Sequence, residues 1–583
     1  MKKILLALLL MLSACAPQSI NNTDTFQGEG FGKQGKIIVD VVIKDDKIEH
    51  IELVKHSEVP GFSGKMIQLA DEIISKNSID VDTIAGATLT SQGFIDAVKD
   101  ALTQAGITQE DLMNANMQEQ QQKIIEQHSD LVIVGSGGAG FVAAIQAKQL
   151  GFEKVTIIEK MAFNGGNTRM SGGEYACYNN WVQESEGIID SKEAFIEDIL
   201  ISGQGRSNET LVRTLADHVL ENAYWLRDEI GVQYKNEQSW YGGHRVARTL
   251  WPVGDGPAYV NTLAQKAEEL GVEVIYNTKA VEIIMENGQA IGIKAVSDGN
   301  SLHFYGDSGV ILATGGFSAN VEMRQQYNTQ WPSLDASIPT TNSPAIVGDG
   351  ILMAQAAGAN LIDMDAIQLY PINNPATGNY YFVDYARLIG NALLVNKDGE
   401  RFVDEKETRE IISRAAIEQK DAMIYEIIDD QVAKSMNLEE DYASEIARCL
   451  DQGVLIKGSL KECAEFFDIP YETLAATIEH YNEMAAQGVD TDFNRTDLIP
   501  IGDGPYLMFA CIVSVHHTMG GVQIDENAHV IDTNGNIIPN LYAAGEVTGG
   551  IHGANRLGSL SIPDTVCFGR IAAATAYNEH LKK

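Results

Sequence analysis

A glycine-rich turn has the residue types and spacing that bind a dinucleotide. The apolar run Leu131 to Val134 predicts a buried strand, and a helix to about Leu150 is expected after the turn. A second apolar run, Val155 to Ile158, ends at Glu159, whose carboxylate can accept ribose hydroxyls. An ordinary tight turn is the alternative. The glycines that would let backbone N–H groups approach a pyrophosphate are Gly135, Gly137, Gly138 and Gly140.

Three further glycine-rich stretches favour a flavin over a nicotinamide. "NGGNTRMSGG", residues 164–173, directly follows the second strand, where backbone must also pass close to an isoalloxazine. "GVILATGGF", 309–317, and "NLYAAGEVTGGIHGANRLGS", 540–559, each predict a strand that runs into a glycine turn. Within the last, Glu546 is placed to hold ribityl hydroxyls. No nicotinamide site is evident in the sequence.

Residues 128–583 resemble the FAD-dependent fumarate reductase and succinate dehydrogenase flavoprotein family, in particular its soluble single-chain reductases of fumarate and urocanate. The four motifs fall in the family's order. The resemblance implies an α/β, Rossmann-like FAD-binding domain in two parts, 128–359 and 509–583, with an inserted clamp (capping) domain at 360–508. Besides the glycines of the first turn, the residues it implies for non-covalent FAD binding are Glu159, Lys160, Asn164, Gly165, Gly166, Asn167, Thr168, Gly172, Gly173, Thr314, Gly315, Gly316, Asp349, Glu546, Arg556, Ser561 and Ile562.

The family transfers hydride from flavin N5 to the β-carbon of an α,β-unsaturated carboxylate and then protonates the α-carbon. Charge accumulates on the carboxylate, so cations and a proton donor are needed. "VHHTMGG" and "HGANRLG" resemble the carboxylate-binding motifs, and "ERFVDEKETRE" resembles the segment with the proton donor. The resemblance assigns His516 and Arg556 to the carboxylate and Arg409 to proton donation, while "DYAR" gives Asp384 and Arg387 as the relay that reprotonates Arg409.

Two positions bear on the substrate. Tyr370, in "IQLYP", stands where fumarate reductases of this group have histidine, and Asp384 stands where they have glutamate. Both resemble urocanate reductase, in which a tyrosine and an aspartate hold the imidazole ring. A carboxylate accepts an imidazole N–H, whereas a second substrate carboxylate would lose a cationic partner. Urocanate is therefore favoured, with fumarate or another aryl or alkyl acrylate as alternatives.

Two alternatives come from other classes. A lipoprotein electron carrier or solute-binding protein could keep the FAD unit without turnover, and a flavin oxidase or steroid dehydrogenase could keep the fold with other chemistry. The set of Arg409, His516 and Arg556 disfavours both.

A smaller α+β module precedes the FAD unit. "KIIVDVVIKDDKIEHIELV" predicts two strands around a turn at Asp45, Asp46 and Lys47, and helices are expected near 64–75 and after residue 91. The hydroxyls of "DTIAGATLTS", 82–91, could cap the second helix, or one could be a covalent attachment point. The module is assigned to 26–106 and a Gln-rich linker to 107–127.

"DTIAGAT" resembles the flavinylation motif of FMN-binding domains, which a dedicated FMN transferase modifies. The resemblance makes Thr88 the residue that is joined covalently to FMN by a phosphoester bond, with Asp82 part of the recognised motif. Ala85 departs from the pattern, because the family usually has a hydroxyl there.

The first fifteen residues, "MKKILLALLLMLSAC", predict a signal peptide. A basic start precedes an apolar stretch that is too short to span a bilayer, and the stretch ends at Cys15 in a sequence that resembles the lipobox of bacterial lipoproteins. We therefore expect an extracytoplasmic protein held at the cell membrane by a lipid anchor. Electrons would come from a membrane donor, either quinol or a flavin carrier linked to NADH dehydrogenase, and pass through FMN to FAD.

Bulk composition excludes several classes. The 583 residues carry a net charge of −38, which argues against nucleic acid as a partner. The five cysteines after Cys15 are scattered without a C-x-x-C pair, so the sequence indicates no metal site, no disulfide framework and no c-type haem.

Overall fold

The computed structural model describes residues 24–44, 47–58, 62–81, 83, 88–108, 112 and 124–582. Cys15, Asp82 and Ala85 lie outside these residues. Contacts divide the chain into two units near residue 124. None of the helices in the described ranges has the length and apolarity that crossing a membrane requires. The five described cysteines are buried and unpaired.

The first unit has a three-stranded antiparallel sheet, in the order β1-β2-β3, and helices α1 and α2 of its described part pack on this sheet. Its core includes the predicted apolar run of the second helix, with Phe94 and Val98 fully buried. Helix α2 lies close to β1, because a Cβ on Gly93 would come within 2.5 Å of the backbone of Phe31. The elements are β1 (Asp24–Phe31), β2 (Lys36–Lys44), β3 (Lys47–His56), α1 (Phe62–Lys76) and α2 (Thr88–Ala105).

The second unit is built on a six-stranded sheet in the order β21-β22-β13-β5-β6-β9. Its five strands from β22 to β9 are parallel. The strands are β5 (Leu131–Val134), β6 (Val155–Ile158), β9 (Glu273–Ile275), β13 (Val310–Leu312), β21 (His529–Ile531) and β22 (Ile537–Ala543). The helices of this part are α4 (Gly138–Leu150), α5 (Gly166–Met170), α6 (Trp181–Glu186), α7 (Lys192–Ser202), α8 (Glu209–Trp225), α9 (Asp255–Glu269), α10 (Val321–Tyr327), α11 (Asp349–Ala356) and α19 (Ser561–His580).

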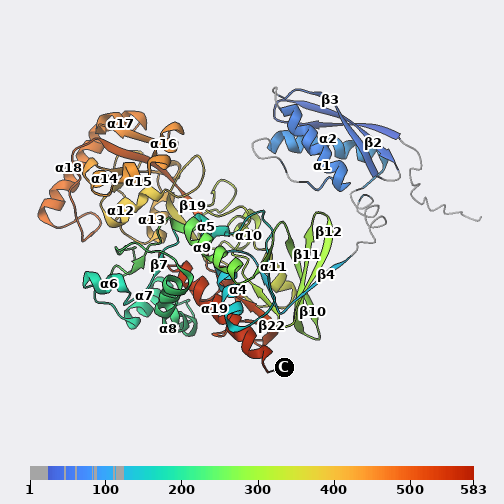
Figure 1. Cartoon of the computed structure of the whole chain (residues 1–583). Helices are drawn as coiled ribbons and strands as arrows, with labels where there is room; N and C mark the ends of the chain where they lie inside the picture. Colours follow the sequence, from blue (N-terminus) through green and yellow to red (C-terminus); the bar gives the residue numbers. More distant parts are fainter. Residues whose placement is uncertain are drawn as a thin grey trace, which may run out of the picture. The chain divides into compact units, whose positions relative to one another are not determined.

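A second sheet, β10-β11-β12-β4, and two small ones complete this part. Helices α4 and α19 pack against each other beside the parallel sheet (Figure 1). The remaining strands are β4 (Ile125–Ser129), β7 (Tyr175–Ala176), β8 (Thr249–Leu250), β10 (Lys279–Glu286), β11 (Gln289–Ser297), β12 (Asn300–Gly306), β14 (Leu361–Ile362), β20 (Gly521–Gln523) and β23 (Thr548–Gly549).

The clamp is a sheet in the order β15-β19-β17-β16, with β18 also paired to β19. Figure 1 shows its helices α14, α16, α17 and α18 gathered away from α4 and α19. Its strands are β15 (Ile367–Asn373), β16 (Leu393–Val395), β17 (Met423–Ile428), β18 (Leu455–Gly458) and β19 (Tyr506–Thr518). Its helices are α12 (Tyr385–Ile389), α13 (Arg409–Ile417), α14 (Asp430–Ser435), α15 (Leu438–Asp441), α16 (Ala443–Asp451), α17 (Leu460–Phe466) and α18 (Tyr471–Gln487), with 3-10 turns η2 (Phe382–Asp384) and η3 (Lys420–Ala422).

Most predicted elements are present, and the differences fall at boundaries. The strands at 131–134 and 155–158 and the helix to Leu150 are confirmed to the residue. Strand β4 begins at Ile125, inside the predicted linker, because it pairs in parallel with β12. Strand β19 crosses the predicted boundary at 508–509 without a break, so it links the clamp sheet directly to the segment with His516.

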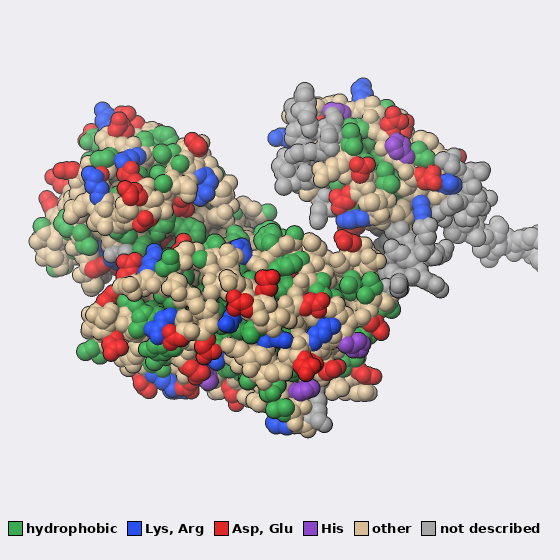
Figure 2. Space-filling view, in the orientation of Figure 1, with side chains coloured by type: hydrophobic (Ala, Val, Ile, Leu, Met, Phe, Trp, Pro, Cys, Tyr) green, Lys and Arg blue, Asp and Glu red, His purple; other side chains and the backbone are tan. Residues whose placement is uncertain are grey.

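The surface of the larger unit carries both signs of charge. Figure 2 shows Asp and Glu side chains interspersed with Lys and Arg across the visible face, and no single patch of one sign dominates it.

Candidate active site

A long cavity runs through the larger unit along the carboxyl ends of β5, β6 and β13. Its empty volume, including the space at its mouth that is open to solvent, is about 1290 Å³. Gly135 has a φ of +103°, and a Cβ there would lie 2.4 Å from the carbonyl oxygen of Ala313. A Cβ on Gly140 would lie 1.9 Å from the oxygen of Gly135, so the last glycine of the turn lets α4 start close to the strand. The glycine turn thus leaves the amino end of α4 open to the cavity.

Glu159 lies at the end of β6, as predicted. Its Oε2 accepts hydrogen bonds from the backbone N (2.9 Å) and hydroxyl (2.7 Å) of Ser136, and its Oε1 accepts from the N of Met161 at 2.8 Å. The neighbouring Lys160 forms an ion pair with Asp349, whose other oxygen is 3.4 Å from Lys279. Acidic and basic groups are therefore fixed at this end of the cavity.

Glu546 lines another part of the cavity, where its Oε1 is 3.6 Å from Nδ1 of His517 and its charge acts on Arg556. Its Oε2 accepts from Asn167 at 2.9 Å, and its Oε1 accepts from the backbone N of Thr518 at 3.1 Å. Burial raises the pKa of Glu546.

The residues fit an FAD molecule. The hydroxyl of Thr314 lines the cavity and is buried without a hydrogen-bond partner in the described part of the chain, so a ligand atom can satisfy it. Bound there, FAD would lie between Glu159 and Glu546, with the glycine turn beside its pyrophosphate.

Fifteen of the predicted FAD contacts line this cavity and six do not. Those that line it are Gly135, Gly137, Gly138, Glu159, Lys160, Gly166, Asn167, Thr168, Thr314, Gly315, Asp349, Glu546, Arg556, Ser561 and Ile562. Those that do not are Gly140, Asn164, Gly165, Gly172, Gly173 and Gly316. Asn164 is turned toward Arg169, which donates to its carbonyl oxygen at 2.8 Å. A Cβ on Gly316 would lie 1.9 Å from the Thr518 hydroxyl, so this glycine serves packing.

A second, smaller cavity adjoins the first and contains the predicted proton donor. Arg409, the first residue of α13, lines it together with Tyr370, Arg387 and Arg556. Arg556 lines both cavities and therefore stands at their junction. This is where a substrate would meet the flavin.

Two guanidinium groups at this junction have N–H donors without a hydrogen-bond partner in the described residues. Nη1 of Arg409 and Nε of Arg556 are buried and have no hydrogen-bond partner in the described part of the protein. Burial and the charge of Arg409 lower the pKa of Arg556 to about 9. An anionic substrate placed between them would relieve both the repulsion and the unmet hydrogen bonds.

His516 completes the predicted carboxylate grip. Its Nδ1 is 2.8 Å from the hydroxyl of Thr341, and its ring centroid lies 5.1 Å from that of Tyr370. Burial, Arg409 and Arg556 hold the pKa of His516 well below its usual value, so the imidazole is neutral near pH 7. A neutral imidazole bonded through Nδ1 can still donate from Nε2 to a carboxylate.

The predicted relay pair forms a buried, bidentate ion pair. Nε of Arg387 is 2.7 Å from Oδ1 of Asp384, and Nη2 is 2.9 Å from Oδ2. The hydroxyl of Tyr370 donates to the same Oδ2 at 2.5 Å. The guanidinium carbon of Arg409 lies 4.9 Å from the centroid of the Tyr370 ring, so all four predicted groups meet.

Sequence reasoning missed three groups around this junction. Oε1 of Glu174 accepts a hydrogen bond from the hydroxyl of Tyr241 at 2.9 Å. Burial, followed by the charge of Glu174, raises the pKa of Tyr241 and that of Tyr380. Glu174 directly follows the "NGGNTRMSGG" stretch, residues 164–173. This closeness to a predicted FAD-binding motif was the signal in the sequence that could have identified it.

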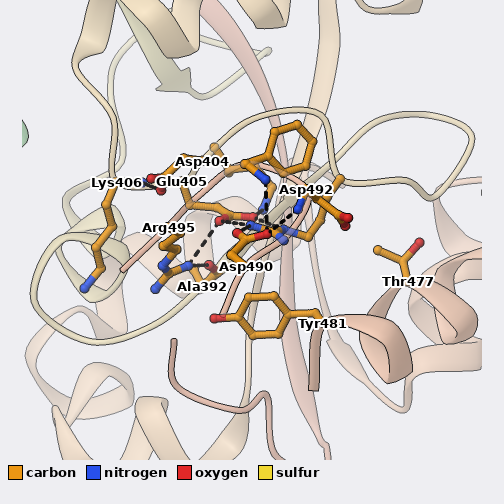
Figure 3. Close-up of polar contacts among 12 residues, drawn as sticks. Ala392, Asp404, Glu405, Lys406, Thr477, Tyr481, Asp490, Asp492 and Arg495 are labelled. Carbon is orange, nitrogen blue, oxygen red and sulfur yellow. Dashed lines mark hydrogen bonds and ion pairs between the residues drawn. The ribbon is translucent and has the colours of Figure 1, made fainter. Parts of the chain in front are cut away.

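A buried ion network fixes the clamp loop that leads to Arg409 (Figure 3). Oε1 of Glu405 is 2.8 Å from Nε of Arg401, and Oε2 is 3.1 Å from Nη1 of Arg495. Nη2 of Arg401 also reaches Asp490 at 3.0 Å. Because the backbone oxygen of Glu405 accepts a hydrogen bond from Nη1 of Arg387, this network is joined to the relay pair.

In the first unit, α2 begins at Thr88, the predicted site of FMN attachment. Its neighbour Thr90 donates its hydroxyl to Oε2 of Glu58 at 2.8 Å, and Oε1 of Glu58 accepts from the backbone N of Gln34 at 2.8 Å. The buried Glu58 thus holds the first turn of α2. The rest of the predicted flavinylation motif lies outside the described residues, apart from Thr83.

Comparisons with known proteins agree with this architecture. An FAD-binding domain family matches residues 130–562, and an FMN-binding domain family matches residues 32–103. The chain is 37% identical to "Urocanate reductase" of Eggerthella lenta over 97% of this chain and 96% of that protein. It is also 37% identical to "Fumarate reductase (cytochrome)" of Shewanella frigidimarina, over 77% of this chain and 76% of that protein.

A third relative, "NADH:acrylate oxidoreductase" of Vibrio harveyi, is 32% identical over 95% of this chain but only 61% of its own length. Among solved structures, the open conformation of a flavocytochrome c3 fumarate reductase matches with a TM-score of 0.66 at 31% identity, covering 86% of this chain and 85% of that one. The chain belongs to the family of FAD-dependent reductases that act on the C=C bond of unsaturated carboxylates, and it carries an FMN-binding domain before its FAD-binding domain.

Proposed function

We propose that this protein reduces urocanate to dihydrourocanate. The observation that carries the proposal is the hydrogen bond from Tyr370, which lines the substrate cavity, to Asp384. Tyr241 also lines this cavity and donates to Glu174, so two phenols face the substrate and each is backed by a carboxylate. Such a wall suits an imidazole N–H and repels a second substrate carboxylate. The resemblance to a urocanate reductase over 97% of the chain supports the same choice.

The residues at the junction of the two cavities have separate roles in the reaction. Bound FAD would supply the hydride to the β-carbon of the substrate. Arg556 and neutral His516 hold the substrate carboxylate and stabilise the charge that develops on it. Arg409 presents an N–H proton to the α-carbon, and Asp384, paired with Arg387, stands behind it to restore that proton. A buried site excludes water from these steps.

Fumarate and other acrylates are the competing substrates, and rates decide between them. Steady-state reduction of urocanate, fumarate, cinnamate and methacrylate should be compared with one artificial electron donor. We expect kcat/KM to be highest with urocanate. A fumarate rate well above the urocanate rate would refute the assignment.

We also propose that the protein works outside the cytoplasm, anchored through lipidated Cys15 and supplied with electrons by a membrane donor through FMN. The support is the lipobox-like sequence at Cys15 and the FMN-binding domain that follows it. A Cys15→Ser variant should move from the membrane fraction to the soluble fraction. Equal membrane attachment of the variant and the natural chain would contradict the anchor.

A lipoprotein electron carrier without turnover is the competing function of another class. Mixing the reduced protein with substrate distinguishes a reductase from an electron carrier, because only a reductase would show substrate-dependent reoxidation of its flavin.

A further inference from the structure

A fully buried glutamate lies beside the relay pair. Glu426 is on β17, opposite Leu394 of β16 and Phe509 of β19, and its side chain has no exposure to solvent. Neither of its carboxylate oxygens has a hydrogen-bond donor in the described part of the chain. An ionised carboxylate without donors is strongly disfavoured in such a place. The surroundings therefore require Glu426 to keep a proton.

The neighbouring Asp384 gives that proton a position. Burial and the negative charge of Asp384 raise the pKa of Glu426 well above its usual value. As a neutral acid, Glu426 can donate a hydrogen bond to the Asp384 carboxylate, which two ionised carboxylates could not share. The titratable and charged groups around Glu426 are Asp384, Arg387, Tyr381, Glu445 and Cys511.

A third acid connects this pair to the surface. Glu445, on α16, accepts from the backbone N of Phe382 at 3.2 Å and of Val383 at 3.0 Å, in the turn that ends at Asp384. Its side chain is 9% exposed and lies 4.0 Å from Arg448, whose side chain is 59% exposed. Burial raises the pKa of Glu445 as well. Glu445 thus connects the exposed side of α16 to the turn that carries Asp384.

We propose that Glu445 and Glu426 pass protons from solvent at α16 to Asp384, from which Arg409 is reprotonated after each turnover. This rests on the proposed function, in which Arg409 gives one proton to the substrate. Glu426 and Glu445 are positioning residues that act through Asp384 and do not touch the substrate.

The proton balance is simple and involves no electrons. After Arg409 has given an N–H proton to the α-carbon, the O–H bond of Glu426 breaks and an O–H bond forms on the Asp384 carboxylate. Asp384 then passes this proton to the neutral guanidine nitrogen of Arg409 and is ionised again beside Arg387. Glu445 then reprotonates Glu426, and water at the surface reprotonates Glu445. One proton from solvent enters for each substrate molecule reduced.

Glu426→Gln tests this route, because glutamine keeps the shape and the hydrogen bond to Asp384 but has no acidic proton. In a rapid-mixing experiment, prereduced enzyme meets substrate, and flavin reoxidation is followed for the first turnover and then at steady state. The first turnover should match that of the natural chain, because Arg409 already carries its proton. Later turnovers should slow at least about tenfold, and their solvent isotope effect should rise.

Glu445→Gln should slow later turnovers in the same way, which keeps the test open if Glu426→Gln does not fold. Glu440→Gln, an exposed glutamate on the neighbouring helix α15, is the control and should change nothing. Steady-state rates that match the natural chain in both variants would overturn the route. So would an equal loss in the first turnover, which would point to a structural role. If the natural chain itself shows no first turnover with any acrylate, the proposed function has failed instead.

Infrared spectroscopy gives a readout that does not depend on activity. The oxidised protein at pH 7 should show the C=O stretch of a neutral carboxylic acid, and Glu426→Gln should lose that band while Glu440→Gln keeps it. If Glu426→Gln leaves the neutral carboxyl bands unchanged, Glu426 is ionised and cannot hold the proton.

Discussion

Tyr370 and Asp384 are joined by a hydrogen bond of 2.5 Å from the phenol to Oδ2, and the same carboxylate is paired with Arg387. Arg387 is therefore engaged and is not free to grip a second substrate carboxylate. This arrangement of Tyr370, Asp384 and Arg387 has two consequences. It determines which chemical group can bind opposite the substrate carboxylate, and it fixes the carboxylate of the relay that reprotonates Arg409.

Exchanging this pair should change the substrate. Tyr370→His with Asp384→Glu restores the two residue types that the fumarate reductases of the family have at these positions. We expect the ratio of kcat/KM for fumarate to that for urocanate to rise by about tenfold or more. The reason is that the site loses the phenol of Tyr370 and gains an imidazole that can be protonated. Tyr370→Phe is the matched control, and it should weaken urocanate turnover without improving fumarate. An unchanged ratio in the double variant would refute this role.

Arg556→Lys should separate charge from geometry. Lysine keeps the positive charge but loses the planar fork that grips a carboxylate through two N–H groups. We expect kcat/KM to fall about 10²-fold to 10³-fold with every acrylate tested. Arg414→Lys, on the exposed side of α13, should stay within about twofold of the natural chain. Equal activity of Arg556→Lys would mean that the substrate carboxylate lies elsewhere.

Three buried histidines should each make a contribution that lowers the stability as the pH falls from 7 to 5. Burial, together with Arg248, lowers the pKa of His244 to about 4, and burial also lowers the pKa of His516 and His517 well below its usual value. The unfolded chain therefore takes up protons at these histidines first, near pH 6.5, which reduces the free energy of unfolding as the pH falls.

Chemical denaturation of the FAD-bound protein at pH 7 and pH 5 measures this effect. His244→Asn should show a shallower decline than the natural chain. Opposite contributions come from His529, whose pKa is raised by Asp525, and from Glu426, Glu445 and Glu546, whose pKa values are raised by burial. A pH dependence of the free energy of unfolding that is the same in His244→Asn as in the natural chain would contradict the role of this histidine.

Thr88→Ala should abolish covalent FMN while FAD remains. The protein should be coexpressed with an FMN transferase, and its intact mass and in-gel flavin fluorescence recorded after denaturation. The natural chain should carry one added FMN, and Thr88→Ala should carry none. Thr90→Ser, which keeps the hydroxyl that contacts Glu58, should remain flavinylated. Retention of FMN by Thr88→Ala would show that another residue is the acceptor.

The sequence predicted the nucleotide-binding core best, because its signals are local. A buried strand, a glycine turn, a helix and an acid follow each other within residues 131–159, and each is present. Strand β1 (Asp24–Phe31) was not predicted, because "DTFQGEGF" has two glycines and few apolar residues. Those glycines are needed where the strand touches α2, and only the packed structure shows that contact.

Only those residues of the substrate site that lie in recognisable sequence motifs were predicted. Arg409, His516, Arg556, Tyr370 and Asp384 come from separate segments and meet around one junction, as the resemblance implied. Glu426 and Lys279 were not predicted, because each is an ordinary charged residue of a strand in sequence. Their importance comes from what lies opposite them, Asp384 and Asp349 respectively, which sequence spacing does not reveal.

The central claim is that Arg409 gives the substrate its proton, and Arg409→Gln tests it most directly. Turnover with urocanate and fumarate should be measured beside substrate binding to the oxidised enzyme, followed by the change in flavin absorbance. We expect turnover to fall about 10²-fold to 10⁴-fold while the substrate still binds. Turnover within twofold of the natural chain would contradict it.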